Sequence, residues 1–79
     1  MIIGRQIREA RALLGLSRSQ LAARVRSVTT ATIMRAELVD DEPPITMAQA
    51  DAIRSFFEGA GIEFVETGML VALAIAGRV

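Results

Sequence analysis

The charged side chains of this 79-residue chain are nine basic and nine acidic groups, and the sequence contains no Cys and no His, so it has no thiol nucleophile and no imidazole base. Every basic residue is an arginine, which binds phosphate and guanine through paired hydrogen bonds. The neighbouring acids Asp40, Asp41 and Glu42 lack the His, Cys or Lys partner of a general acid-base or nucleophilic site. We therefore expect no enzyme activity, no metal site and no cofactor.

The charges separate along the chain although they sum to zero. Residues 1–35 contain seven arginines and one glutamate, a formal charge of +6, whereas residues 36–79 carry −6. This asymmetry favours an anionic partner for the first half, with ion pairing between the halves as the alternative. Without Trp or Tyr and with three Phe, an aromatic platform for single-stranded bases is not expected.

Two short helices with a tight connection are predicted within residues 16–37. Ser17 can cap the first helix, with Gln20 at the capping-box spacing. Thr29 or Thr30 can cap the second. Apolar residues at helical spacing would face a core: Leu21, Ala22 and Val25 in the first helix, Ile33 and Ala36 in the second. The remaining side chains of the second helix would lie on the surface: Thr32, Met34 and Arg35.

The flanking elements must support this helix pair. A helix is predicted over residues 3–14, ended by Gly15 in the left-handed conformation. The two prolines of residues 40–44 predict a loop, and a further helix begins at Thr46 and ends at residues 58–61. The expected inward residues are Ile3, Ile7, Ala10 and Leu14 in the first helix and Ala50, Ile53, Phe57 and also Phe56 in the last.

The character of the sequence changes over residues 62–79. Residues 62–66 partly alternate, residues 67–68 indicate a turn, and an apolar run follows, which predicts a β-hairpin or two short strands. A fifth helix over residues 69–76 is the alternative. Because an exposed apolar run promotes aggregation, it must fold back on the core or pair with a second chain, and we favour strand pairing across a two-fold axis. The expected interface residues are Met69, Leu70, Val71, Leu73 and Ile75.

No targeting or membrane-spanning segment is recognisable. The N-terminus has a charge at Arg5 and no apolar region of the secretory type. The longest apolar run, residues 69–76, is far short of the ~20 residues that a membrane span needs. We therefore expect a cytoplasmic protein without a membrane partner.

Two motifs carry a family resemblance over roughly residues 3–60. The sequence IRxARxLLGLSRxxLA, followed by VTxxTIxRAE, resembles the lambda-repressor/Cro-like (XRE-family) helix-turn-helix domains, and AGIEFVETG resembles the ending of small regulators of that family. The resemblance implies a mainly α fold, a bundle of four to five helices over residues 1–61. A short C-terminal β-strand or hairpin for dimerisation would follow over residues 62–79. Helix three would lie in the DNA major groove, and helix two would cross the backbone.

The resemblance also implies roles for individual residues. The positions that contact base edges are Thr30, Ala31 and Arg35. The positions that contact phosphate or the edge of the groove are Arg18, Thr29 and Thr32. Arg11 and Glu37 match a buried salt bridge between helices one and three, which is structural. The alternative for Arg35 is a surface ion pair with Glu37 or Asp40.

The turn between helices two and three departs from the family pattern. Residues 25–29, VRSVT, contain no glycine and one residue more than usual. A non-glycine residue with positive φ costs about 1 kcal/mol, so we expect the extra residue to relax the turn into a longer loop. Such a loop would shift helix three relative to helix two.

These observations predict a homodimeric, sequence-specific regulator of transcription, a repressor or mobile-element switch that binds duplex DNA at a pseudo-palindromic operator. The alternative is an interaction module of the same fold, antiactivator-like or antitoxin-like, that binds another regulator protein and not DNA. The altered turn and the apolar tail favour the alternative, whereas the charge of +6 in residues 1–35 favours DNA.

Overall fold

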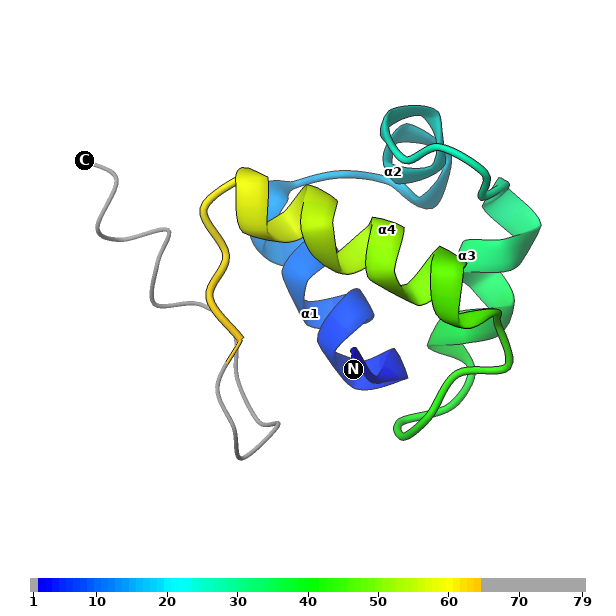
Figure 1. Cartoon of the computed structure of the whole chain (residues 1–79). Helices are drawn as coiled ribbons and strands as arrows, with labels where there is room; N and C mark the ends of the chain where they lie inside the picture. Colours follow the sequence, from blue (N-terminus) through cyan, green and yellow to red (C-terminus); the bar gives the residue numbers. More distant parts are fainter. Residues whose placement is uncertain (1, 65–79) are drawn as a thin grey trace.

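Four α-helices follow one another in this computed structural model, which describes residues 2–64 (Figure 1). They are α1 (Gly4–Leu14), α2 (Arg18–Arg24), α3 (Thr30–Glu37) and α4 (Met47–Gly59). The expected mainly α architecture is confirmed, and each helix lies within two residues of its predicted position. The predicted strand or hairpin begins at residue 62 and lies mostly outside the described residues, and its alternative, a helix over residues 69–76, lies wholly outside them.

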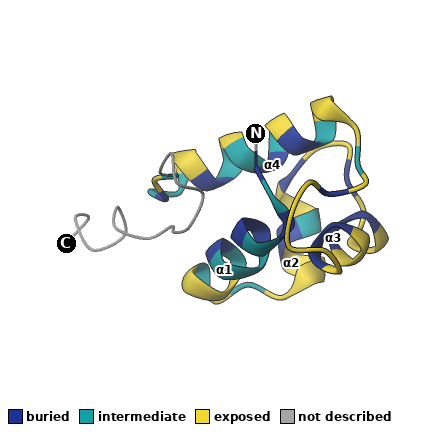
Figure 2. Cartoon of the chain, turned by 90° about the horizontal axis from the view of Figure 1, so that it is seen from below, coloured by how far each residue is buried: buried dark blue, intermediate teal, exposed yellow. Residues whose placement is uncertain are grey.

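The helices form two layers. Helix α4 crosses in front of α1 in Figure 1, and the view from below in Figure 2 places α4 on one side and α1, α2 and α3 on the other. The buried faces are turned toward the space between these layers, and exposed residues line the outer side of α4 (Figure 2). An amphipathic helix is stable in water only when its apolar face is covered in this way.

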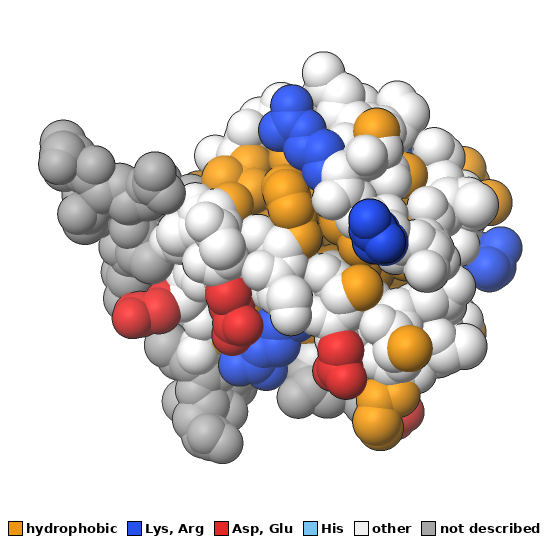
Figure 3. Space-filling view, turned by 45° about the horizontal axis from the view of Figure 1, so that its top comes forward, with side chains coloured by type: hydrophobic (Ala, Val, Ile, Leu, Met, Phe, Trp, Pro, Cys, Tyr) orange, Lys and Arg blue, Asp and Glu red, His pale blue; other side chains and the backbone are white. Residues whose placement is uncertain are grey.

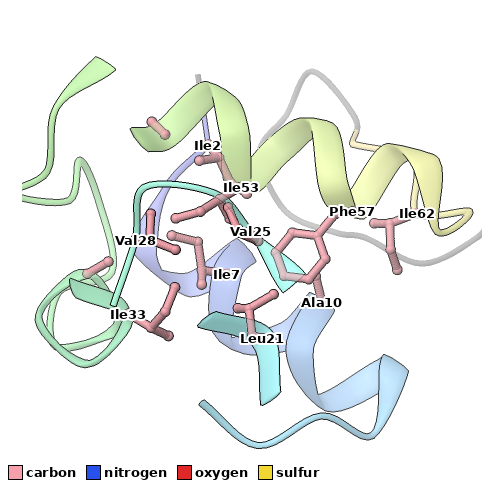
Figure 4. Close-up of a cluster of buried hydrophobic side chains, with 12 residues drawn as sticks. Ile2, Ile7, Ala10, Leu21, Val25, Val28, Ile33, Ile53, Phe57 and Ile62 are labelled. Atoms are coloured by element: carbon pink, nitrogen blue, oxygen red, sulfur yellow. The ribbon is translucent and has the colours of Figure 1, made fainter. Parts of the chain in front are cut away.

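The core lies between the two layers (Figure 4). The ring of Phe57 from α4 is fully buried near Ala10 of α1 and Leu21 of α2. Of the residues expected to face inward, Ile3, Leu14, Ala22 and Phe56 are only half-buried, and the others are buried. The buried apolar residues are Ile2, Ile7, Ala10, Leu21, Val25, Val28, Ile33, Ala36, Ala50, Ile53, Phe57 and Ile62.

The first turn of α1 is closed by the loop that follows α3. The first backbone N–H groups of a helix lack partners within it. Here the N–H of Gly4 donates to the Asp41 carbonyl at 2.8 Å, and that of Arg5 donates to the Asp40 carbonyl at 3.1 Å. The approach requires glycine, because a Cβ on Gly4 would collide with the Val39 carbonyl oxygen.

Helix α4 begins with a complete capping box. The Thr46 hydroxyl accepts a hydrogen bond from the Gln49 N–H at 3.0 Å, and the Gln49 side-chain carbonyl accepts one from the Thr46 N–H at 3.0 Å. Beyond the end of α4, the Phe64 ring packs against Phe57, with 6.3 Å between ring centroids. The Arg54 guanidinium lies over the Phe64 ring, 5.1 Å from its centroid.

Candidate nucleic-acid interface

Helices α2 and α3 are each started by a hydroxyl cap. Ser17 accepts a hydrogen bond from the Gln20 N–H at 3.0 Å and donates its own N–H to the Gln20 side chain at 2.8 Å, which completes the expected capping box. Thr29, one of the two candidates, caps α3 by accepting from the Thr32 N–H at 3.2 Å. Both helix starts are therefore specified by residues adjacent to them in the chain.

The connection between α2 and α3 retains a left-handed residue. Ser27 has φ +69° and is the one non-glycine residue with positive φ within residues 2–64. Our expectation that the extra residue would relax the turn is wrong at this position. The five-residue connection buries Val25 and Val28 on either side of the turn, and this anchoring holds Ser27 in the strained region. The Gln49 side chain donates to the Ser27 carbonyl at 3.3 Å.

Glu37, in the last turn of α3, lies at the centre of a buried ion cluster. Its side chain is 1% exposed and accepts two hydrogen bonds from Arg11 of α1, from Nε at 2.7 Å and from Nη2 at 2.9 Å. Arg11 also donates from Nη1 to the Leu16 carbonyl at 3.0 Å. The hydrogen bond to Glu37, followed by its charge, raises the pKa of Arg11 against the opposing effect of burial. Arg11 and Glu37 thus form the buried pair that we expected from the sequence.

Arg18 joins this cluster from α2. Its Nε donates to Glu37 Oε1 at 3.0 Å, and its side chain remains 45% exposed. Arg8 adds a further bond from α1, donating from Nη1 to the Glu37 backbone carbonyl at 2.7 Å. Glu37 therefore connects α3 to both α1 and α2, and Arg18, expected as a phosphate contact, has a structural bond as well.

The outer face of α3 carries the residues expected to contact bases. Thr30, Ala31 and Arg35 are exposed. Met34 is 45% exposed and Leu38, directly after the helix, is 77% exposed. The other four residues of α3 are buried: Thr32, Ile33, Ala36 and Glu37. Helix α3 therefore has one free face, which is exposed, and one packed face.

Thr32 does not belong to this free face. It is 4% exposed, and its hydroxyl forms a 3.0 Å hydrogen bond with the hydroxyl of the exposed Thr29. The expectation that Thr32 lies on the surface is wrong, because on the helix its position adjoins the buried Ile33 and Ala36. Thr29 is positioned beside the start of α3 with its hydroxyl occupied by capping.

Three arginines near α2 and α3 form no ion pair with any residue of the part of the chain that the structure describes. Arg24 ends α2, Arg26 lies in the connection, and Arg35 lies on α3, and all three are exposed. The alternative pairing of Arg35 with Glu37 or Asp40 is not formed, since these acids bind other arginines. Free guanidinium groups retain all five donors for phosphate or bases.

Basic and acidic side chains are separated on the face shown in Figure 3. In the view of Figure 3, arginines lie on the upper part of the face and acidic side chains lie along the lower part, where one arginine accompanies them. Asp40, in the loop after α3, forms an ion pair with Arg8, and this hydrogen bond and the positive charge lower the pKa of Asp40. Arg54 and Glu58 form a 2.9 Å pair one turn apart on α4.

The remaining predicted site residues belong to the C-terminal segment of the sequence. The expected dimer or partner interface, Met69, Leu70, Val71, Leu73 and Ile75, lies outside the described residues. Within residues 2–64, no helix has the length and apolar character to cross a membrane. In the same region, no three His, Cys, Asp or Glu side chains are grouped so as to hold a metal ion.

Sequence reasoning missed the contacts of Arg8 and the bond between Arg18 and Glu37. For Arg8, the signal was available, because it precedes Arg11 by three residues and so shares the face of α1 that meets Glu37.

Comparison of the chain with protein-family models, with curated proteins and with solved structures found no match.

Proposed function

We propose that this chain is a sequence-specific, double-stranded DNA-binding regulator of transcription, in which α2, residues 25–29 and α3 form a helix-turn-helix of the lambda-repressor/Cro-like type. Helix α3 would lie in the major groove, with Thr30, Ala31 and Arg35 toward base edges. Arg18 and Thr29 would lie near the phosphates. The protein would act in the cytoplasm, as a repressor or a mobile-element switch.

The observation that carries this proposal is the contrast between the two faces of α3. One face is fixed, since Glu37 binds Arg11 and Arg18 and thereby attaches α3 to two other helices. The other face is free, with Ala31 and Arg35 exposed one turn apart. A helix that must enter a groove needs a rigid base and an unobstructed outer face, because its side chains must meet base edges in one register.

The charge distribution supports an anionic partner. Arg24, Arg26 and Arg35 are exposed and have no ion pair among the described residues. Phosphate contacts fix the position of a protein on duplex DNA, and a bidentate arginine contact identifies guanine. We assign Arg24 and Arg26 to phosphates, and Arg35 to a base.

A homodimer completes the proposal. Eight residues of α3 provide about 12 Å of helix, which covers only a few base pairs. Two copies related by a two-fold axis would place two such helices about 34 Å apart on a pseudo-palindromic operator. The apolar run at residues 69–76 is our candidate for the dimer contact.

The test begins with the full chain and a library of random duplexes. Duplexes that the protein retains are sequenced, and the most enriched one is titrated in mobility-shift assays at two salt concentrations. If Arg24 and Arg26 of each protomer neutralise phosphates, the slope of log affinity against log salt should be about −4 for the dimer. Replacement of Arg35 by Ala should weaken specific binding by about 1–3 kcal/mol.

Arg54→Ala is the matched control, because Arg54 lies on α4 and is already paired with Glu58. It should leave binding unchanged. Arg26→Ala should weaken binding to all duplexes equally and make the salt slope shallower. Failure to enrich any duplex, or equal effects of Arg35→Ala and Arg54→Ala, would contradict the proposal.

A second candidate function is an interaction module, antiactivator-like or antitoxin-like, that binds another regulator protein through an apolar surface. The observation that favours it is the exposure of Met34 on α3 and of Leu38 directly after that helix, which a protein partner could cover. This function predicts that Leu70→Asp or Leu73→Asp abolishes regulatory activity. It also predicts that Arg35→Ala has no effect and that no duplex is retained.

A further inference from the structure

The free face of α3 is more apolar than its role in the proposed function requires. At 100° per residue, Thr30, Met34, Leu38, Ala31 and Arg35 follow one another within about 140° of the helix circumference. All five are exposed. Three of them, Ala31, Met34 and Leu38, have no hydrogen-bond donor and at most the weak thioether acceptor of Met34.

This composition limits what α3 can distinguish in a major groove. Among the five exposed residues, only Thr30 and Arg35 can form strong hydrogen bonds, and none carries the amide or carboxylate that identifies adenine or cytosine. The thymine C5-methyl group is the one apolar feature of the major-groove edge. It is therefore the base feature that Ala31 and Met34 fit.

The spacing places the apolar and charged contacts close together. Ala31 and Met34 are separated by about 4.5 Å along the helix, and Arg35 follows Met34 directly, with about 1.5 Å of rise. Base pairs are stacked about 3.4 Å apart. Ala31, Met34 and Arg35 would therefore contact the same base pair or base pairs one or two steps apart.

We propose that α3 recognises thymine C5-methyl groups through Ala31 and Met34, next to a guanine bound by Arg35. This inference rests on the proposed function and extends it, because it names the chemical groups on the duplex that determine specificity. Burial of one methyl group corresponds to about a fourfold gain in affinity. A half-site with two contacted thymines would gain about 15-fold.

The experiment replaces thymine by uracil in the duplex enriched from the random library. Uracil lacks the C5-methyl group and keeps every hydrogen-bonding group of thymine, so it isolates the methyl contact. We expect at least one single replacement within two base pairs of a selected guanine to weaken binding about fourfold. Replacement of that guanine by 7-deazaguanine, which lacks the N7 acceptor, should weaken binding by the wild-type protein. It should not weaken binding by Arg35→Ala.

Two methionine variants identify the side chain responsible. Met34→Ala should lose the uracil effect at the thymine that Met34 contacts, because that contact has already been removed, and should keep the effect at a thymine that Ala31 contacts. Met47→Ala is the matched control, since Met47 is also exposed, at 66%, but lies on α4. It should retain the fourfold difference. Far-UV circular dichroism of both variants checks that their helix content is unchanged.

The outcomes separate the two proposals. If a duplex is enriched and bound specifically but every uracil duplex binds as tightly as its parent, the methyl inference is overturned and the proposed function stands. The same holds if every uracil effect persists unchanged in Met34→Ala. If no duplex is enriched, the proposed function fails first, and the inference that depends on it fails as well.

Discussion

Replacing Glu37 by Gln tests whether the buried ion cluster holds α3 in place. The substitution keeps the size of the side chain and removes its negative charge. The Arg11 guanidinium, which is bound bidentately and only 20% exposed, would then remain buried without a counter-charge. Arg18 would lose the same partner but lies near the surface.

The expected loss of stability is large for a domain of this size. Removing one partner of a buried ion pair costs about 3–5 kcal/mol, and the partial exposure of Arg18 places the Glu37→Gln value near the lower end, about 3 kcal/mol. A 79-residue domain has a total unfolding free energy of about 4–12 kcal/mol. The single substitution should therefore remove a quarter or more of the stability.

Urea denaturation followed by far-UV circular dichroism is the appropriate assay, because the chain has no Trp or Tyr to serve as a fluorescent probe. With a slope of about 1 kcal/mol per molar urea, Glu37→Gln should lower the midpoint by about 3 M. Glu58→Gln makes the same chemical change in the exposed pair on α4. It should cost only about 0.3–0.5 kcal/mol.

A loss below 1 kcal/mol for Glu37→Gln, or a loss equal to that of Glu58→Gln, would refute this reasoning. A double variant provides an independent check. Arg11→Met combined with Glu37→Met removes both buried charges, and such replacements are often neutral. It should therefore be more stable than Glu37→Gln. If it is less stable, the cluster contributes through attraction rather than through the penalty of an unpaired charge.

Three further substitutions test separate parts of the fold. Gly4→Ala should destabilise the protein by about 1–3 kcal/mol in urea denaturation, because the added Cβ meets a backbone carbonyl, whereas Gly59→Ala has open space and should not destabilise it. Ser27→Gly should stabilise by up to about 1 kcal/mol by relieving the positive φ; a lower urea midpoint would contradict this. Arg8 lowers the pKa of Asp40 below its ordinary value of 3.8. The ionised carboxylate therefore stabilises the folded state fully above pH 3.8, and this stabilisation is lost as the pH falls through the lower pKa of the folded state. Asp40→Asn should therefore show a smaller fall in Tm between about pH 5 and pH 2 than the natural protein, and equal falls would argue against the pair.

The parts of the fold that sequence reasoning predicted well depend on signals between neighbouring residues. Ser17 and Thr46 begin helices because their hydroxyls satisfy backbone N–H groups three residues on. Gly15 ends α1 because it adopts φ +69° without strain. The inward faces followed equally directly from helical periodicity, since Ile7, Ile33 and other regularly spaced apolar residues are buried.

The details that sequence reasoning missed depend on contacts between distant parts of the chain. Whether Arg18 extends into solvent or binds Glu37 depends on how closely α2 approaches the end of α3, which no local pattern specifies. Ser27 has a left-handed backbone because two flanking valines are anchored in the core, and serine has no preference that would predict this. Thr32 lies at the border of the buried arc of α3, where periodicity does not distinguish a polar surface residue from a buried one.

The junction between the start of α1 and the loop after α3 has a consequence for how the chain folds. The backbone bond from Gly4 to Asp41 closes a loop of roughly 37 residues, which costs about 3 kcal/mol of chain entropy plus a constant. The bonds from Arg8 and Arg11 to Glu37 lie within this same closure, so they add stabilisation without a further loop entropy.

Residues 4–41 should therefore gain and lose structure together, as one cooperative unit. An amide proton at the start of a helix ordinarily exchanges with solvent quickly, because helix ends open on their own. The amide of Gly4 can open only when this closed loop opens. It should consequently exchange as slowly as the amides of core residues such as Ile33, although Gly4 is the first residue of α1.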